Sequence, residues 1–145
     1  MLITSNPPII LEFEYNKPIN DVWSAITETN KMKNWFFEQM EDFKPQVGYK
    51  TAFPVISGDR TFTHLWKVLA VEPNKKITTQ WTYTEYIGEG HVTFLLDKVN
   101  EDTTKLTLIN EVIADFPTDV PEFTRDSCTA GWNYFLGERL TAYLN

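Results

Sequence analysis

The chain has 145 residues, a length that predicts a single domain over residues 1–145. Of these residues 42% are hydrophobic and 23% are charged, which is ordinary for a globular protein. Its formal net charge of −7 argues against nucleic acids and anionic membrane surfaces as partners, since both require clustered Lys and Arg. A single cysteine, Cys128, excludes an internal disulfide framework and fits a reducing compartment.

The sequence contains no recognisable targeting or membrane-spanning segment. Residues 1–8 lack the charged and apolar regions of a signal peptide. No apolar run approaches the length of about 18 residues that a spanning helix needs. We therefore expect a cytoplasmic protein that does not insert into membranes.

The first part of the chain predicts one strand followed by two short helices. Residues 9–15 alternate apolar and polar side chains, as in a half-buried strand. Pro18 is predicted at the first position of a helix, because the apolar residues that follow it recur at helical spacing. A second short helix is expected over residues 30–36.

The middle of the chain predicts an antiparallel meander. Residues 43–54 suggest two short strands around Val47 and Gly48, and residues 61–112 suggest longer strands with alternating inward side chains. Turns are expected at residues 57–60, 73–75, 88–90 and 100–103. Connections of hairpin length make such a sheet antiparallel.

The last stretch, residues 122–144, is predicted to form one long helix that covers the sheet. Its large apolar residues recur on one face: Trp132, Phe135, Leu136, Leu140, Tyr143 and Leu144. Asp119 and Glu122 form a pattern typical of a capped helix start. Gly131 and Gly137 interrupt the helix, which indicates either a helix that closes over a cup or a close approach of helix to sheet.

Several residues, in this order and spacing, carry a resemblance to a known family. They are Pro18, Val22-Trp23, Ala25-Ile26-Thr27, Trp35-Phe36, Gly48, Thr104-Lys105-Leu106-Thr107-Leu108, Gly131-Trp132, Leu136 and Leu140. With them the chain resembles the START-like helix-grip superfamily (SRPBCC) and, within it, the activator of heat-shock-protein-90 ATPase homologue family.

The resemblance implies an α+β fold of the helix-grip type. In that fold a curved antiparallel sheet wraps around a long C-terminal helix, two short helices follow the first strand, and a hydrophobic cavity lies between sheet and helix. Relatives of this kind bind lipids, hormones or polyketides, and one branch stimulates a chaperone ATPase as a domain of a larger protein.

Large side chains from the strands and the last helix are predicted to line a ligand-binding pocket. The candidate residues are Phe37 and Phe53 at the rim, and His64, Trp66, Trp81, Tyr83, Phe94, Trp132, Phe135 and Leu136 in the walls. Aromatic walls suit a flat, mostly apolar ligand. The same rings could instead fill a solid core, because protein interiors are normally close-packed.

No catalytic, metal-binding or cofactor-binding constellation is visible in the sequence. His64 and His91 are the only histidines, and two histidines on different strands do not make a metal site. Phosphate loops, dinucleotide fingerprints and nucleophile elbows are missing. We therefore expect a protein without cofactor that releases its ligand unchanged, although an enzyme with a titratable pair in the pocket stays an alternative.

Two functions of different class remain open. A small-molecule carrier or sensor would have an enclosed pocket with a few polar groups, such as His64, Tyr83 and Asn110. Arg125 or Arg139 could then reach a ligand carboxylate at the mouth, or could form ordinary surface ion pairs. A protein-interaction module would instead have a filled cavity and an exposed apolar patch for its partner.

Overall fold

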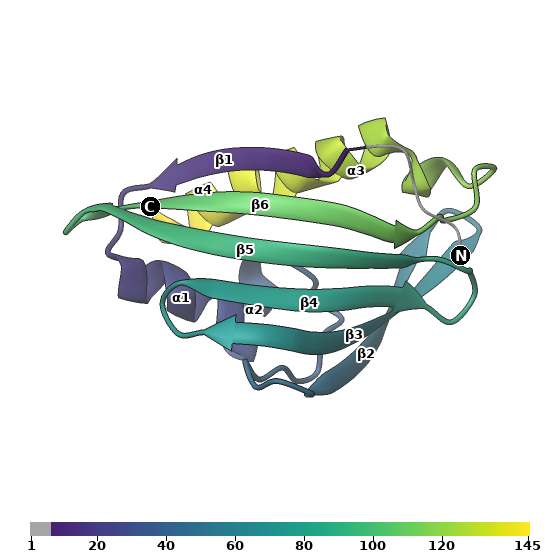
Figure 1. Ribbon diagram of the computed structural model, residues 1–145, viewed down its shortest axis with the longest axis horizontal. Helices are drawn as coiled ribbons and strands as arrows, with labels where there is room; N and C mark the ends of the chain where they lie inside the picture. Colours follow the sequence, from purple (N-terminus) through teal and green to yellow (C-terminus); the bar gives the residue numbers. More distant parts are fainter. Residues whose placement is uncertain (1–6) are drawn as a thin grey trace.

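The computed structural model describes residues 7–145; residues 1–6, most of the segment judged not to be a signal peptide, lie outside the described residues. Six strands form one antiparallel sheet in the order β1-β6-β5-β4-β3-β2, and the helices lie on one side of it (Figure 1). The first half comprises β1 (Ile9–Tyr15), α1 (Ile19–Thr27), α2 (Thr29–Trp35), β2 (Lys50–Ser57) and β3 (Arg60–Glu72). The second half comprises β4 (Lys76–Tyr83), β5 (Glu89–Asn100), β6 (Thr103–Ala114), η1 (Pro121–Phe123), α3 (Arg125–Trp132), η2 (Asn133–Arg139) and α4 (Leu140–Leu144).

The predicted α+β helix-grip fold is confirmed by this arrangement. Strands β2 to β6 form the meander, and β1 pairs with β6 at the far edge of the sheet. The inward faces also agree with the predicted alternation, because Phe62, His64, Trp66 and Val68 of β3 are all buried. Gly90, expected in a turn, lies instead inside β5 and pairs with Trp81.

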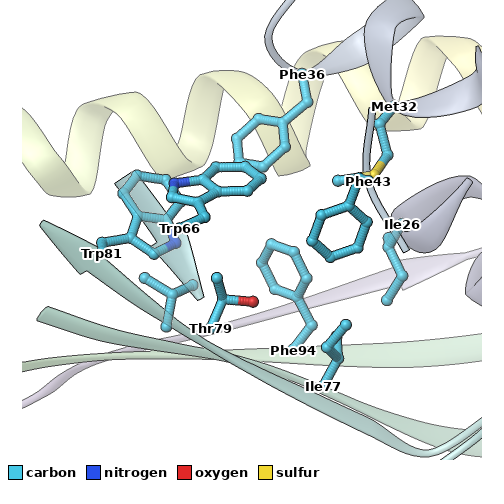
Figure 2. Close-up of a pocket in the computed structure, with 10 residues that line it drawn as sticks. Ile26, Met32, Phe36, Phe43, Trp66, Ile77, Thr79, Trp81 and Phe94 are labelled. Carbon is cyan, nitrogen blue, oxygen red and sulfur yellow. The ribbon is translucent and has the colours of Figure 1, made fainter. Parts of the chain in front are cut away.

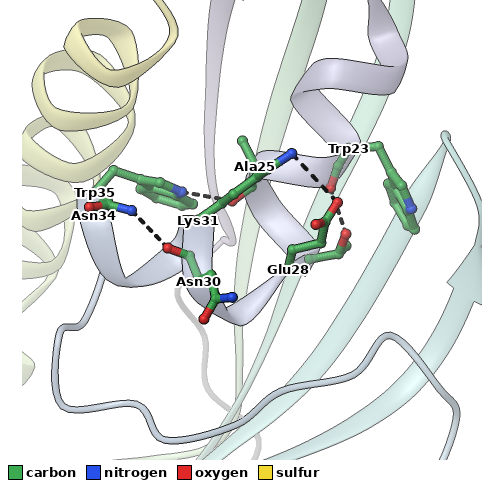
Figure 3. Close-up of polar contacts among 8 residues, drawn as sticks. Trp23, Ala25, Glu28, Asn30, Lys31, Asn34 and Trp35 are labelled. Atoms are coloured by element: carbon green, nitrogen blue, oxygen red, sulfur yellow. Dashed lines mark hydrogen bonds and ion pairs between the residues drawn. The ribbon is translucent and has the colours of Figure 1, made fainter.

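Helices α1 and α2 lie close to their predicted positions. Pro18 is the residue before α1 rather than its first residue, because its extended ψ of 153° leaves it outside the helix. Its carbonyl still accepts hydrogen bonds from the Asp21 and Val22 amides. The indole Nε1 of Trp35 donates to the Ala25 carbonyl at 2.8 Å and so ties α2 to α1 (Figure 3).

The prediction of two strands over residues 43–54 is wrong. Residues 44–49 form a turn closed by hydrogen bonds from the Gln46 and Tyr49 amides, and only β2 follows it. Gly48 has a φ of +89°, a left-handed conformation that suits glycine and interrupts an extended path. Phe43, which precedes the turn, packs edge-on against Trp66 with ring centroids 6.0 Å apart.

The C-terminal helix differs from its prediction at its start and in its middle. It begins after Thr124, whose Oγ1 accepts a hydrogen bond from the Ser127 amide, so Thr124 rather than Asp119 caps it. Residues 133–139 form a π-helical segment in which the Leu136 carbonyl accepts from the Tyr15 hydroxyl at 2.7 Å. Tyr143, expected on the buried face, is 38% exposed.

The interior of the fold has a filled half and a hollow half. In the filled half, Phe36 and Met32 from the helical side meet Trp66, Phe94 and neighbouring strand residues (Figure 2). Only about 10 Å³ of free space remains among these side chains. Trp66 stacks on Trp81 at 4.9 Å, and this pair marks the boundary between the two halves.

Candidate functional site

The hollow half is a cavity of about 490 Å³ between the sheet and α3–η2. Its volume falls in the range of about 300–1,000 Å³ that is typical of ligand pockets. On the helix side, Gly131 lies on the cavity wall, and a Cβ placed there would meet no atom within 4 Å apart from its own chain neighbours and helix backbone. At Gly137, by contrast, a Cβ would lie 3.3 Å from a ring carbon of Phe13, so this glycine permits close approach of helix and sheet.

Aromatic and aliphatic side chains make up most of the cavity wall. The strands contribute Val55, Phe62, His64, Trp81, Tyr83, Gly90, Val92, Asn110 and Val112. The helix contributes Ser127, Cys128, Gly131, Trp132 and Phe135, and the connecting segments add Phe36, Phe37, Phe116, Glu122 and Phe123. Pro7, Ile9, Ser57 and Arg125 complete the lining.

The structure brings six of the ten predicted site residues together on this wall. They are Phe37, His64, Trp81, Tyr83, Trp132 and Phe135. The other four, Phe53, Trp66, Phe94 and Leu136, are buried in the packed core and do not line the cavity. The inward direction of Trp66, Phe94 and Leu136 was predicted from strand and helix periodicity, whereas Phe53 was expected at the rim. Periodicity does not tell where along an element the core stops being filled.

Sequence reasoning missed the aromatic residues at the far end of the cavity. Phe116 and Phe123 stack at 4.9 Å, and Phe123 lies 5.1 Å from the Tyr83 ring. Phe116 lies in the irregular segment after β6, and Phe123, which the prediction placed in the long helix over residues 122–144, ends the short η1 helix before α3. Phe62 shares its strand face with His64 and Trp66, so the same alternation that predicted those two could have identified it.

His64 is the most buried polar group of the cavity wall. Its ring stacks on Phe53 at 5.0 Å and lies 4.9 Å from Phe37 and 4.8 Å from Tyr83. Burial lowers the pKa of His64 from 6.5 to about 4, although its hydrogen bond to the Phe62 carbonyl acts in the opposite direction. The imidazole is therefore neutral at physiological pH.

Tyr83 and Cys128 are also neutral at this pH. Burial raises the pKa of the Tyr83 hydroxyl well above its usual value, and burial likewise raises the pKa of the Cys128 thiol. The thiol lies 3.8 Å from the Glu122 carbonyl oxygen. Neither group has the ionised form that nucleophilic chemistry would require.

A polar contact closes the end of the cavity beside the β2–β3 turn. The Ser57 hydroxyl donates to Glu122 Oε2 at 2.8 Å, and Arg60 Nη1 lies 3.6 Å from Glu122 Oε1. The hydrogen bond from Ser57 lowers the pKa of the Glu122 carboxyl, which keeps it ionised. At the rim, the Arg125 guanidinium donates to the Pro7 and Pro8 carbonyls at 2.5 and 3.2 Å.

The described residues offer few groups for a metal. Among residues 7–145, His, Cys, Asp and Glu side chains nowhere gather in threes at positions that could hold a metal ion. Over the same range, every helix is too short or too polar to cross a bilayer.

A curved antiparallel sheet, a covering C-terminal helix and an apolar cavity between them define a protein of the helix-grip class. Residues 16–145 match the family described as "Activator of Hsp90 ATPase homolog 1-like protein". The chain belongs to this family. Among curated proteins, none matches the sequence.

Solved structures share the fold at low sequence identity. CV1439 from Chromobacterium violaceum has a TM-score of 0.78 at 17% identity, over 94% of this chain and 96% of its own. PFC0360w, an HSP90 activator from Plasmodium falciparum, has a TM-score of 0.71 at 21% identity, over 91% and 92%. DynU16, from the dynemicin biosynthetic locus, has a TM-score of 0.72 at 24% identity over 96% of this chain, which spans 47% of its length.

Proposed function

We propose that this protein binds one small, flat, mostly apolar molecule in the cavity between the sheet and the C-terminal helix. The observation that carries the proposal is the open volume of about 490 Å³ in an interior that is otherwise closely packed. Trp81, Trp132 and Phe135 supply the flat walls, and His64, Tyr83 and Asn110 supply polar groups that can orient a ligand.

Contact with a protein partner is the second candidate function. It draws on the family name and on the HSP90 activator from Plasmodium falciparum that shares the fold. A module of that kind predicts a filled cavity, whereas the cavity here is open. The large apolar residues that this protein exposes are also spread over several elements, for example Ile10, Ile56, Ile87 and Val99. These observations favour the small-molecule proposal.

Fluorescence energy transfer to a flat aromatic probe tests the proposal. The probe is 1-hydroxypyrene, whose absorption overlaps indole emission, so binding beside Trp81 and Trp132 should quench tryptophan emission and excite the probe. We expect saturable binding with one probe per chain by native mass spectrometry. Trp132→Ala should abolish it, because that ring forms part of the wall.

Trp23→Ala is the matched control, since Trp23 of α1 packs against the hydrophobic core and does not line the cavity. Loss of binding in Trp132→Ala but not in Trp23→Ala supports the proposal. A folded Trp132→Ala variant that binds the probe as tightly as the unmodified protein would place the binding site elsewhere.

We also propose that binding is not followed by chemistry. His64 and Tyr83 are the ring groups that could exchange protons with a ligand, and burial moves both of their pKa values away from neutrality. Mass spectrometry of a confirmed ligand after incubation should show it unchanged. Turnover of the ligand that disappears in His64→Ala would instead make an enzymatic function the favoured proposal.

A further inference from the structure

A hydrogen bond within β3 fixes which nitrogen of His64 carries the proton. Nδ1 lies 3.0 Å from the Phe62 carbonyl oxygen. Because a carbonyl oxygen can only accept, Nδ1 must be the protonated nitrogen of the neutral ring. Nε2 then holds a lone pair and can accept a hydrogen bond but cannot donate one.

This lone pair has no partner within the protein as far as the structure describes it. Over residues 7–145, the one hydrogen bond formed by the His64 ring is the bond of Nδ1. The ring lies on the cavity wall, with Phe37 and Phe53 packed against it, so an occupant of the cavity is what can reach Nε2. Nε2 is not one of the fully buried unpartnered atoms of the described residues, so it is accessible from the cavity, and a ligand donor would complement it.

The charged groups of the wall point to the same ligand chemistry. Arg125 is the sole cation among the described lining residues, and two of its five N–H groups donate to the Pro7 and Pro8 carbonyls. Glu122 contributes an ionised carboxylate whose Oε1 is buried, lies 3.6 Å from Arg60 Nη1 and receives no hydrogen bond from any described residue. A ligand carboxylate beside His64 would therefore place its own lone pairs against Nε2 and receive no hydrogen bond there.

We infer that His64 accepts a hydrogen bond from the ligand, and that the cavity therefore selects uncharged aromatic molecules bearing a hydroxyl or amine N–H over ethers and carboxylates. The inference rests on the proposed function and adds the ligand class to it. An ether of the same shape offers Nε2 only another lone pair, so the ether oxygen and Nε2 are both left without a donor.

Four probes with one ring system test the inference: pyrene, 1-hydroxypyrene, 1-methoxypyrene and pyrene-1-carboxylate. The hydroxyl probe should bind about five- to tenfold more tightly than the methoxy probe, the ratio that one buried neutral hydrogen bond supports. Pyrene-1-carboxylate should bind more weakly than pyrene itself. In His64→Phe, which keeps a ring in the stack, the hydroxyl-to-methoxy ratio should fall to about one, because the acceptor is lost.

His91→Phe is the matched control, since His91 bonds to Glu89 at 2.7 Å and does not line the cavity. It should keep the ratio of the unmodified protein. A measurement that needs no variant is the two-bond ¹H–¹⁵N NMR spectrum of His64. It should show the Nδ1–H form, with an Nε2 resonance that shifts on binding 1-hydroxypyrene but not on binding pyrene.

The outcomes separate this inference from the proposed function. If pyrene binds but the hydroxyl and methoxy probes bind equally, the role of His64 is overturned while the binding cavity stands. Persistence of the ratio in His64→Phe, or an Nε2–H form in the NMR spectrum, would also overturn it. If none of the four probes binds, both the inference and the proposed function are wrong.

Discussion

At the scale of single residues, two glycines of the C-terminal helix have different roles. Gly131 faces open space in the cavity, whereas Gly137 lies against Phe13. The sequence alone left both explanations open for a helix glycine, since either a cup or a close approach removes the side chain. The structure assigns one explanation to each position.

Alanine substitution should separate these two roles. Gly131→Ala should stabilise the fold by about 0.5–1 kcal/mol, the difference in helix propensity, because the added methyl group meets nothing. Gly137→Ala should gain less or lose stability, because its Cβ would lie 3.3 Å from Phe13 Cε1. Urea unfolding of both variants gives the order of their unfolding free energies. A Gly137→Ala variant that is more stable than Gly131→Ala would contradict this account.

Burial of His64 should make stability depend on pH. The folded-state pKa is about 4 and the unfolded value is near 6.5, so the unfolded chain binds more protons between these values. Stability should therefore fall as the pH falls from 6.5 to 4, by about 3 kcal/mol in total at 1.4 kcal/mol per pKa unit. Unfolding free energies across this range should show a shallower slope in His64→Phe. An identical slope would mean that His64 is accessible to protons in the folded state.

At the scale of elements, the C-terminal helix is attached to the sheet through its π-helical segment. The buried Tyr15 hydroxyl at the end of β1 donates to the Leu136 carbonyl at 2.7 Å, and Thr141 Oγ1 approaches the same carbonyl at 3.3 Å. Side-chain donors thus bond to helix backbone where the regular ladder changes. This contact positions Phe135 and Trp132 over the cavity.

Removal of the Tyr15 hydroxyl should weaken this attachment. Tyr15→Phe is expected to destabilise the fold by about 1 kcal/mol, at the low end for a buried acceptor because Thr141 still reaches it. Tyr143→Phe is the matched control, since Tyr143 is exposed, and it should change stability little. Equal unfolding midpoints for the two variants would show that the hydrogen bond contributes nothing.

Sequence reasoning succeeded where a pattern repeats and failed where the chain is irregular. Alternation along β3 predicted the inward direction of His64 and Trp66, and helical spacing predicted Trp132 and Leu136. Tertiary contacts that no local pattern encodes decide the turn at Gly48, the cap at Thr124 and the placement of the Phe116 and Phe123 rings. Whether an inward ring packs in the core or lines the cavity is likewise decided by neighbours distant in sequence.

At the scale of the whole molecule, one face of the sheet is covered in two ways. Beside α1 and α2 the covering is solid, with about 10 Å³ left free, while beneath α3 and η2 it leaves an open cavity of about 490 Å³. The packed half, with the Trp35–Ala25 hydrogen bond, holds the fold together. The hollow half is then free to take up a ligand without repacking the core, which is why we regard it as the functional site.

Blocking the cavity from the helix side tests this account most directly. Gly131→Phe places a ring in the open space, whereas Ala130→Phe adds the same ring at the adjacent, exposed position of α3. Titration with 1-hydroxypyrene, followed by the anisotropy of probe emission, should show binding weakened at least about tenfold, or about 1.4 kcal/mol, in Gly131→Phe and unchanged in Ala130→Phe. A folded Gly131→Phe variant that binds the probe as tightly as the unmodified protein would contradict the central claim that the cavity is the binding site.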